Sequence, residues 1–129
     1  MKRTAALCVL MMSAGILVKA QTEIFNPMKN AIKGNDAAAL VKTFAPSLDL
    51  NLEGNTSTYS KVQSEFVLKD FFKKHPVNDF SIVHTGSSKG GLQFAIGRYV
   101  SGADSYSVLI RVRQVGEEYL VHEISFVKE

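Results

Sequence analysis

The stretch from residue 59 to residue 128 restricts the fold most, because a helical pattern, a proline and four strand patterns follow one another in it. Apolar side chains at helical spacing predict a helix over residues 60–75, which Pro76 ends. Short turns that contain glycine separate the strand patterns, which predicts an antiparallel meander. The four strands are expected at residues 79–86, 92–101, 105–115 and 119–128.

Alternation within these strands predicts which face of the sheet meets the helices. Even-numbered positions are much more apolar than odd-numbered ones, so we expect the even face to point inward. The even face carries Phe94 and Ile110 together with the polar residues His84, Arg98, Tyr106 and His122. The odd, outward face carries Tyr99, Leu109, Arg111 and Val121. A bulge at Gly97 would reverse part of this pattern, since it would turn Arg98 outward and Tyr99 inward.

Two short helices and a short strand are expected before the long helix. Asn26 and Pro27 are typical of an N-cap and a first helical position, and Gly34 of a left-handed helix end. Asn35 then caps a second helix, which Pro46 ends. Residues 47–51 alternate as a strand, and residues 56–58 are compatible with another. The order predicts an α+β fold with three N-terminal helices packed on one face of a curved, mainly antiparallel sheet.

The first twenty residues have the pattern of a secretory signal peptide. Lys2 and Arg3 precede a mostly apolar, uncharged run over residues 5–18, and Val18-Lys19-Ala20 is a cleavage pattern. The run is shorter than the ~20 apolar residues of a membrane span. We therefore expect residues 1–20 to be removed and residues 21–129 to form one domain. The protein is expected to be periplasmic or secreted, with no stable membrane insertion after cleavage.

Cleavage would also change the charge and the thiol content. The chain has 15 basic and 12 acidic residues, but Lys2, Arg3 and Lys19 lie within residues 1–20. The 12 basic residues that remain balance the 12 acidic ones. The net charge of the mature chain therefore no longer favours a nucleic-acid partner. The single cysteine, Cys8, would leave as well. Its loss excludes a disulfide, a cysteine-ligated metal and a cysteine nucleophile.

Several short motifs resemble those of a known family. They are Asn26-Pro27, Gly34-Asn35, Tyr59-Ser60, Gln63, Asp70-Phe71-Phe72, His84-Thr85-Gly86-Ser87-Ser88 and Ala95-Ile96-Gly97. Together they resemble an exported Bacteroidota family of unknown function with the nuclear-transport-factor-2-like fold, which is also called cystatin-like and is shared by ketosteroid isomerase. The resemblance covers nearly all of residues 22–129. It implies a cone-shaped fold and export, and it implies no established activity.

The inward face lacks the groups that known enzymes of this fold use. It contains no carboxylate, so the carboxylate base and paired acid of ketosteroid isomerase have no counterpart. By resemblance to the fold, His84 and His122 lie three strands apart, about 14 Å, which is too far for a shared metal ion. We therefore expect no catalytic residue, no metal and no cofactor. Each histidine is either half-buried with one hydrogen bond or part of a pocket in which Arg98 anchors an anionic group.

These observations favour a non-catalytic binding module for a small apolar or anionic ligand. The candidate pocket between the long helix and the sheet comprises His84, Arg98, Tyr106, His122, Phe94 and Ile110. The candidate homodimer face comprises Tyr99, Leu109, Arg111 and Val121, because this face commonly makes homodimers in the fold that the chain resembles. Two alternatives stay open: a structural homodimer, and a small enzyme in which His84 or His122 acts as acid and base. Phenylalanines could also fill the cone completely.

Overall fold

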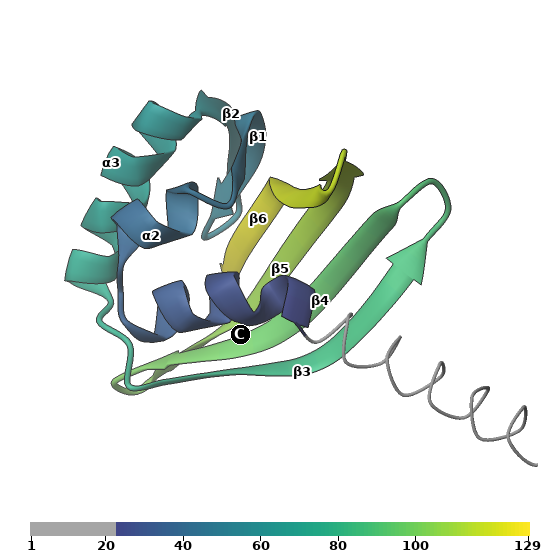
Figure 1. Ribbon diagram of the computed structural model, residues 1–129. Helices are drawn as coiled ribbons and strands as arrows, with labels where there is room; N and C mark the ends of the chain where they lie inside the picture. The colour runs from purple at the N-terminus through teal and green to yellow at the C-terminus, as the bar shows by residue number, and fades with distance from the viewer. Residues whose placement is uncertain (1–22) are drawn as a thin grey trace, which may run out of the picture.

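The computed structural model describes residues 23–129, so the predicted signal peptide lies outside the described residues. The fold is α+β, with one curved sheet of six strands that carries the helices on one side (Figure 1). The strands are β1 (Phe44–Leu52), β2 (Asn55–Ser60), β3 (Asp79–Ser88), β4 (Leu92–Ser101), β5 (Asp104–Val115) and β6 (Glu118–Lys128). The helices are α2 (Ala37–Val41), α3 (Lys61–Lys74) and a helical segment over residues 23–33.

The sheet has the strand order β2-β1-β6-β5-β4-β3. All neighbouring strands are antiparallel except β1 and β6, which are parallel. The predicted meander is confirmed as β3 to β6, and β1 and β2 extend the sheet beside its last strand. Pro46 does not end a helix, because α2 already ends at Val41. It lies inside β1, where the pairing with β6 is irregular and a missing N–H is tolerated.

The loop between residues 23–33 and α2 differs from its prediction. Residues 23–26 are already helical, so Asn26 is not an N-cap. Asn35, and not Gly34, takes the left-handed conformation, with a φ of 49°, which asparagine tolerates better than most residues. The N-cap of α2 is Asp36, whose side chain accepts a hydrogen bond from the Ala39 N–H. The Asn35 side chain is thereby free for bonds to distant parts of the chain.

Helix α3 begins at a capping box and packs against the inner face of the sheet. The Ser60 hydroxyl accepts a hydrogen bond from the Gln63 N–H, and the Gln63 side chain accepts one from the Ser60 N–H. The buried residues of α3 are Ser64, Leu68, Phe71 and Phe72. Within residues 23–129, no helix is both long enough and apolar enough to cross a membrane.

Aromatic rings fill the space between α3 and the sheet. The centroid of the Phe71 ring lies 5.0 Å from that of Phe126, 5.5 Å from that of Tyr106 and 6.0 Å from that of Tyr99. None of these four side chains is more than 4% exposed. Edge-to-face and tilted ring contacts stabilise a core beyond the effect of their buried area. These rings occupy the place where the sequence analysis expected a pocket.

The inner face of the sheet is not the even face throughout. Tyr99 of β4 pairs with Tyr106 of β5, so odd positions of β4 face inward together with even positions of β5. The cause is the β4–β5 turn, in which Ser101 pairs with Asp104 across two residues, where the sequence analysis expected three. A change of one residue in the register moves every side chain of a strand to the other face. The prediction that Tyr99 faces outward was therefore wrong.

A bulge in β3 turns His84 away from the helices. Val83 has no partner between the pairs Ile82–Gly97 and His84–Ile96. The alternation of faces shifts at such an extra residue, so Ile82 faces inward and His84 outward. The alternative with Tyr99 inside and Arg98 outside is correct, but its cause is the two-residue turn and not a bulge at Gly97. The bulge lies in β3, next to the partner of Gly97.

A second bulge has a similar effect in β6. His122 has no partner between the pairs Val112–Val121 and Arg111–Glu123. Val121 is fully buried on the inner face, so the prediction that it faces outward was wrong. His122 lies beside Arg111 on the outer side of the sheet, which contradicts its predicted inward position. Bulges are frequent next to functional sites, because they redirect a side chain without breaking the sheet.

Candidate functional site

The hydroxyl group of Tyr99 anchors the end of α3. It donates a hydrogen bond to the carbonyl oxygen of His75 and accepts one from Asn35 Nδ2 at 2.9 Å. Asn35 Oδ1 in turn accepts a hydrogen bond from the Val77 N–H at 2.8 Å. Burial raises the pKa of Tyr99 above its ordinary value, so the hydroxyl stays protonated at neutral pH. These bonds tie the loop before α2 to the segment after α3.

A second polar cluster joins Glu53, His75 and Tyr106. The Tyr106 hydroxyl lies 3.2 Å from Glu53 Oε1 and 3.1 Å from His75 Nδ1, and His75 Nε2 lies 3.6 Å from the same Glu53 oxygen. Burial, followed by the hydrogen bond to Glu53, raises the pKa of Tyr106 to about 12. The three groups are partners of one another and connect the β1–β2 turn, the end of α3 and β5. We assign this cluster to holding the fold together.

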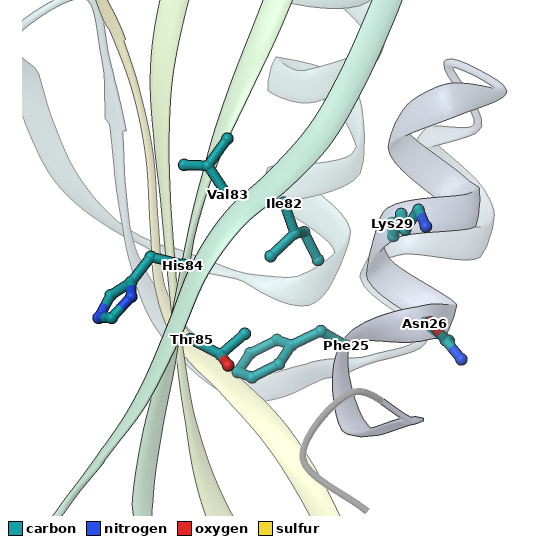
Figure 2. A pocket seen from close by; sticks show the side chains of 7 residues that line it. All are labelled: Phe25, Asn26, Lys29, Ile82, Val83, His84 and Thr85. Atoms are coloured by element: carbon teal, nitrogen blue, oxygen red, sulfur yellow. The ribbon is translucent and has the colours of Figure 1, made fainter. Parts of the chain in front are cut away.

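A cleft of about 390 Å³ lies between residues 23–33 and the edge strand β3 (Figure 2). Phe25 reaches from the helix toward Ile82 and Thr85, whereas His84 extends from the opposite side of the strand. Lys29 lies on the helix, far from His84. The cleft therefore runs around the edge of the sheet and does not bring its histidine and its lysine to a common point.

A second hollow of about 390 Å³ lies on the outer face of the sheet, and we call it the outer groove. Apolar side chains of β4 and β5 make most of its walls. The residues that line it are Ser88, Leu92, Gln93, Phe94, Ile96, Leu109, Arg111 and His122. Apolar walls with a few polar groups are typical of small-molecule sites, which usually span about 300–1,000 Å³.

Cross-strand pairing builds the walls of the outer groove. Ile96 is the direct partner of Leu109, and Phe94 is the direct partner of Arg111. On its other side, Phe94 pairs with Gly86 of β3. A Cβ atom on residue 86 would lie 2.6 Å from Phe94 Cε1. Glycine at this position therefore allows the Phe94 ring to lie across β3, where it closes one side of the groove.

The bulge in β6 brings a neutral histidine to the outer groove. Partial burial, and next the charge of Arg113, lowers the pKa of His122 below its ordinary value. Its Nδ1 atom is buried and has no hydrogen-bond partner within residues 23–129. Gln93 Oε1 is likewise without a partner among these residues, but Gln93 pairs with the buried Val112 and so lies on the inner side of the sheet. Most buried polar atoms in proteins have a partner. A ligand group in the outer groove that reached His122 Nδ1 would supply one.

Positive charge predominates at the rim of the outer groove. Arg111 Nη1 lies 3.9 Å from Glu123 Oε1, and both side chains are at least a third exposed. Such a long, solvated contact contributes little stability. Arg113 follows on the same face of β5 and is exposed. A guanidinium group presents paired donors that match a carboxylate, sulfonate or phosphate, so the groove combines apolar walls with an anion-binding rim.

The residues of the predicted pocket do not meet at one place. His122 and Phe94 line the outer groove, and His84 lines the edge cleft. Tyr106 and Ile110 are buried in the core, and Arg98 is exposed, with its Nε 3.5 Å from Glu129 Oε2. Among residues 23–129, no three histidine, cysteine or acidic residues lie close enough to hold a metal ion.

The predicted dimer face is divided between the two sides of the sheet. Leu109 and Arg111 lie on the outer face and line the outer groove. Tyr99 and Val121 are fully buried in the core. Leu92 and Ile96 were missed as outer residues because the even face of β4 was placed inward. The signal that would have identified Leu92 and Ile96 as outer residues is Gly102, since glycine favours a two-residue hairpin turn. In the structure Gly102 begins such a turn with a φ of 60°.

Comparison with known proteins places the fold in a known group. Residues 25–127 match the family described as "Domain of unknown function (DUF4783)". The structure resembles that of a DUF4783 family protein from Bacteroides ovatus ATCC 8483, with a TM-score of 0.76 and 23% identity, over 81% of this chain and 94% of that chain. It also resembles an NTF2-like protein of unknown function from Shewanella baltica OS155, with a TM-score of 0.67 and 11% identity, over 87% of this chain and 93% of that chain. No curated protein matches the chain.

These similarities confirm the predicted α+β fold and the resemblance to a family of unknown function with the nuclear-transport-factor-2-like fold. A further neighbour is a cystatin fold protein from Novosphingobium aromaticivorans, with a TM-score of 0.63 and 15% identity, over 81% of this chain and 95% of that chain. At these identities the neighbours show the fold alone.

Proposed function

The chain belongs to the DUF4783 family, and from this premise we propose that it is an exported, non-catalytic binding module. Its outer groove takes a small molecule with an apolar body and an anionic group. The observation that carries the proposal is the groove itself, in which apolar side chains and the unpartnered His122 Nδ1 meet on a sheet face that no other element of residues 23–129 covers.

The walls of the groove match the apolar part of such a ligand. Leu92, Phe94, Ile96 and Leu109 gather at adjacent positions of β4 and β5 and are only half-buried. Full burial of such a side chain contributes about 1.5–3 kcal/mol relative to full exposure. Because these side chains are already half-buried, roughly half of that free energy remains for the binding of a ligand. Arg111 and Arg113 supply the donors for the anionic group.

The polar groups of the groove favour binding over catalysis. None of the described residues that line it is a carboxylate. Burial and Arg113 lower the pKa of His122 and outweigh the charges of Glu123 and Asp49, which raise it. No acidic side chain of residues 23–129 hydrogen-bonds to His122 Nδ1 to orient the ring for an acid-base reaction. The same holds for His84, because none of the described residues that line the edge cleft is a carboxylate either. The alternative of a small enzyme based on His84 or His122 therefore has less support than binding.

We include in this proposal that the protein is exported and that its mature domain has three N-terminal helices. The support for export is the pattern of residues 1–20, with its basic start, apolar run and cleavage motif. Removal of residues 1–20 would leave the three helical segments and the sheet as one domain. The intact mass of the protein, isolated from its host, tests this: a chain that keeps residues 1–20 would count against export.

A structural homodimer is the second candidate, since the same outer face carries apolar side chains beyond the groove. Val127 is 39% exposed there and lies outside the groove. Two copies that paired through this face would cover the groove. The dimer predicts self-association that depends on concentration, whereas the ligand proposal predicts an open groove in a monomer.

The proposal is tested with the anionic fluorophore anilinonaphthalene sulfonate, which has the expected combination of an aromatic body and an anionic group. We expect saturable fluorescence enhancement that Leu109→Asp weakens by about tenfold or more, because a carboxylate would stand in the apolar wall. Val127→Asp is the matched control, since it adds the same charge to the same face outside the groove. Binding that both variants reduce equally, or that neither reduces, would sink the proposal.

Sedimentation of the same three proteins separates the two candidates. A monomer that binds the dye in the groove supports the binding module. A dimer that Leu109→Asp converts to monomers, with no dye binding before conversion, supports the structural homodimer instead.

A further inference from the structure

A ridge of exposed side chains runs along α3 on the side that faces away from the sheet. Phe66 is 69% exposed and Val62 is 67% exposed, although the opposite face of the same helix is buried in the core. Phe66 lies two positions from both Ser64 and Leu68, which are fully buried. At about 100° per residue, this spacing places Phe66 about 160° from each of them. The two apolar side chains therefore project outward.

Lysines continue the ridge and flank it. Lys69 and Lys73 follow Phe66 by three and seven positions on the same side of α3, and both are exposed. We call Val62, Phe66, Lys69 and Lys73 the α3 ridge. On the side of α2, Lys42 and Lys61 line a shallow hollow together with Val62.

The carboxylates near the ridge do not balance these lysines. Asp70 is already paired with Lys74, with 3.0 Å between Oδ2 and Nζ. Glu65 and Asp36, which line a hollow together with Lys69, are the two carboxylates that stand against the four lysines Lys42, Lys61, Lys69 and Lys73. The ridge thus consists of two apolar side chains surrounded by positive charge. A partner that fits it has an apolar interior and a negatively charged surface.

We propose that the α3 ridge docks the protein onto an anionic phospholipid surface. Phe66 and Val62 enter the boundary between headgroups and acyl chains, and the lysine ammonium groups contact lipid phosphates. Interfacial helices bind in this way, with aromatic and aliphatic side chains on one side and lysines that extend to the headgroups. The outer groove lies on the opposite side of the sheet, so it would remain open to solvent when the ridge is docked.

The shape and charge of the ridge argue against the other occupants. A second copy of the chain that docked through its own ridge would bring a second set of unbalanced lysines to the same interface, which is repulsive. A stable protein interface buries about 800 Å² on each partner, far more than two projecting side chains supply. Figure 1 shows α3 at the periphery of the molecule, where a flat surface can reach it. A membrane needs only a few inserted side chains, together with several basic residues near its surface.

The test is co-sedimentation of the full chain with vesicles of phosphatidylcholine, with and without phosphatidylglycerol. We expect binding only to the anionic vesicles, and weaker binding as salt rises. Lys69→Glu with Lys73→Glu should weaken binding about 25-fold or more, since each lysine near an anionic surface contributes about fivefold. Phe66→Ser should weaken it by about tenfold, the effect of withdrawing an aromatic ring from the boundary.

Val83→Ser and Lys89→Glu are the matched controls, because they change an exposed valine of β3 and an exposed lysine of the turn between β3 and β4. All these positions are at the surface, and an unchanged melting temperature verifies that each variant folds. Equal binding to neutral vesicles, or no binding at all, would overturn the proposal. So would α3 variants that bind as well as the controls, since residues 1–20 or another surface would then be responsible.

Discussion

The inner and outer faces of the sheet use similar side chains in different ways. On the inner face, Tyr99 and Phe126 are fully buried and lie in ring contact, and the Tyr99 hydroxyl has both a donor and an acceptor. On the outer face, Phe94 and Leu109 are half-buried, and His122 Nδ1 has no hydrogen-bond partner in the part of the chain that the structure describes. The inner face completes its contacts within the chain. The outer face leaves apolar area and a polar atom for something else to contact, and for this reason we place the function there.

Two phenylalanines on opposite faces test this contrast most strongly. Phe126→Ala should lower the free energy of unfolding by about 3–5 kcal/mol, because it leaves a cavity among the packed rings. Phe94→Ala should lower it by only about 1 kcal/mol, since the ring is half in solvent. The same Phe94→Ala change should abolish most of the dye binding by the outer groove. Urea denaturation measures the first pair of effects, and equal losses of stability would show that both faces are structural.

Two glycines of adjacent strands sharpen the comparison. A Cβ atom on Gly97 would lie 2.7 Å from Phe80 Cε1 and 2.9 Å from the Ser81 carbonyl oxygen, inside the core and against backbone. Gly97→Ala should therefore cost about 1–3 kcal/mol of stability, as overpacking usually does. Gly86→Ala meets only the ring of Phe94, which can swing toward solvent, so its cost should stay below about 1 kcal/mol.

The two glycine variants should differ in the opposite sense when dye binding is measured. Gly86→Ala displaces the ring that closes one side of the outer groove, so it should weaken binding although the protein stays stable. Gly97→Ala should leave the affinity of the folded protein nearly unchanged. If Gly86→Ala kept full affinity, the Phe94 ring would not be part of the site.

The elements of this fold could be predicted from the sequence, but the faces of the sheet could not. Helix α3 and strands β3 to β6 follow from local periodicity and from glycine-containing turns, and their predicted bounds agree with the structure to within two residues. The faces depend on single residues: a turn of two residues after Ser101 and the extra residues Val83 and His122. Because the side-chain period of a strand is two, each of these changes moves side chains to the opposite face.

The contacts that close the core were out of reach for a different reason. The hydrogen bond from Asn35 to Tyr99 joins residues that are 64 positions apart. Local patterns favoured Asn35 as a helix cap, and its left-handed backbone conformation became evident only in the structure. Likewise, His75 and Glu53 looked like a helix end and a turn, yet they meet at the Tyr106 hydroxyl. Tertiary partners of this kind leave no signal in a window of neighbouring residues.

The smallest expected effect concerns the pH dependence of stability, which the outer face should supply through His122. Partial burial and Arg113 lower the pKa of His122 in the folded chain, whereas the unfolded chain has the ordinary value of about 6.5. As the pH falls through 6.5, the unfolded state takes up the proton first. The stability that neutral His122 contributes is therefore present above about pH 6.5 and is lost as the pH falls through the lower, folded value.

Melting temperatures recorded from about pH 7.5 down to about pH 5 measure this loss. His122→Gln should show a smaller decrease than the wild type over that interval, because glutamine has no proton to gain. His84→Gln is the control, since it removes an exposed histidine of the same sheet face and leaves His122 in place. Identical curves for the wild type and His122→Gln would mean that the His122 ring is as free to protonate in the folded chain as in the unfolded one. The His122 ring would then no longer distinguish the outer face from the inner face. Only the half-buried apolar side chains of the outer groove would support the contrast.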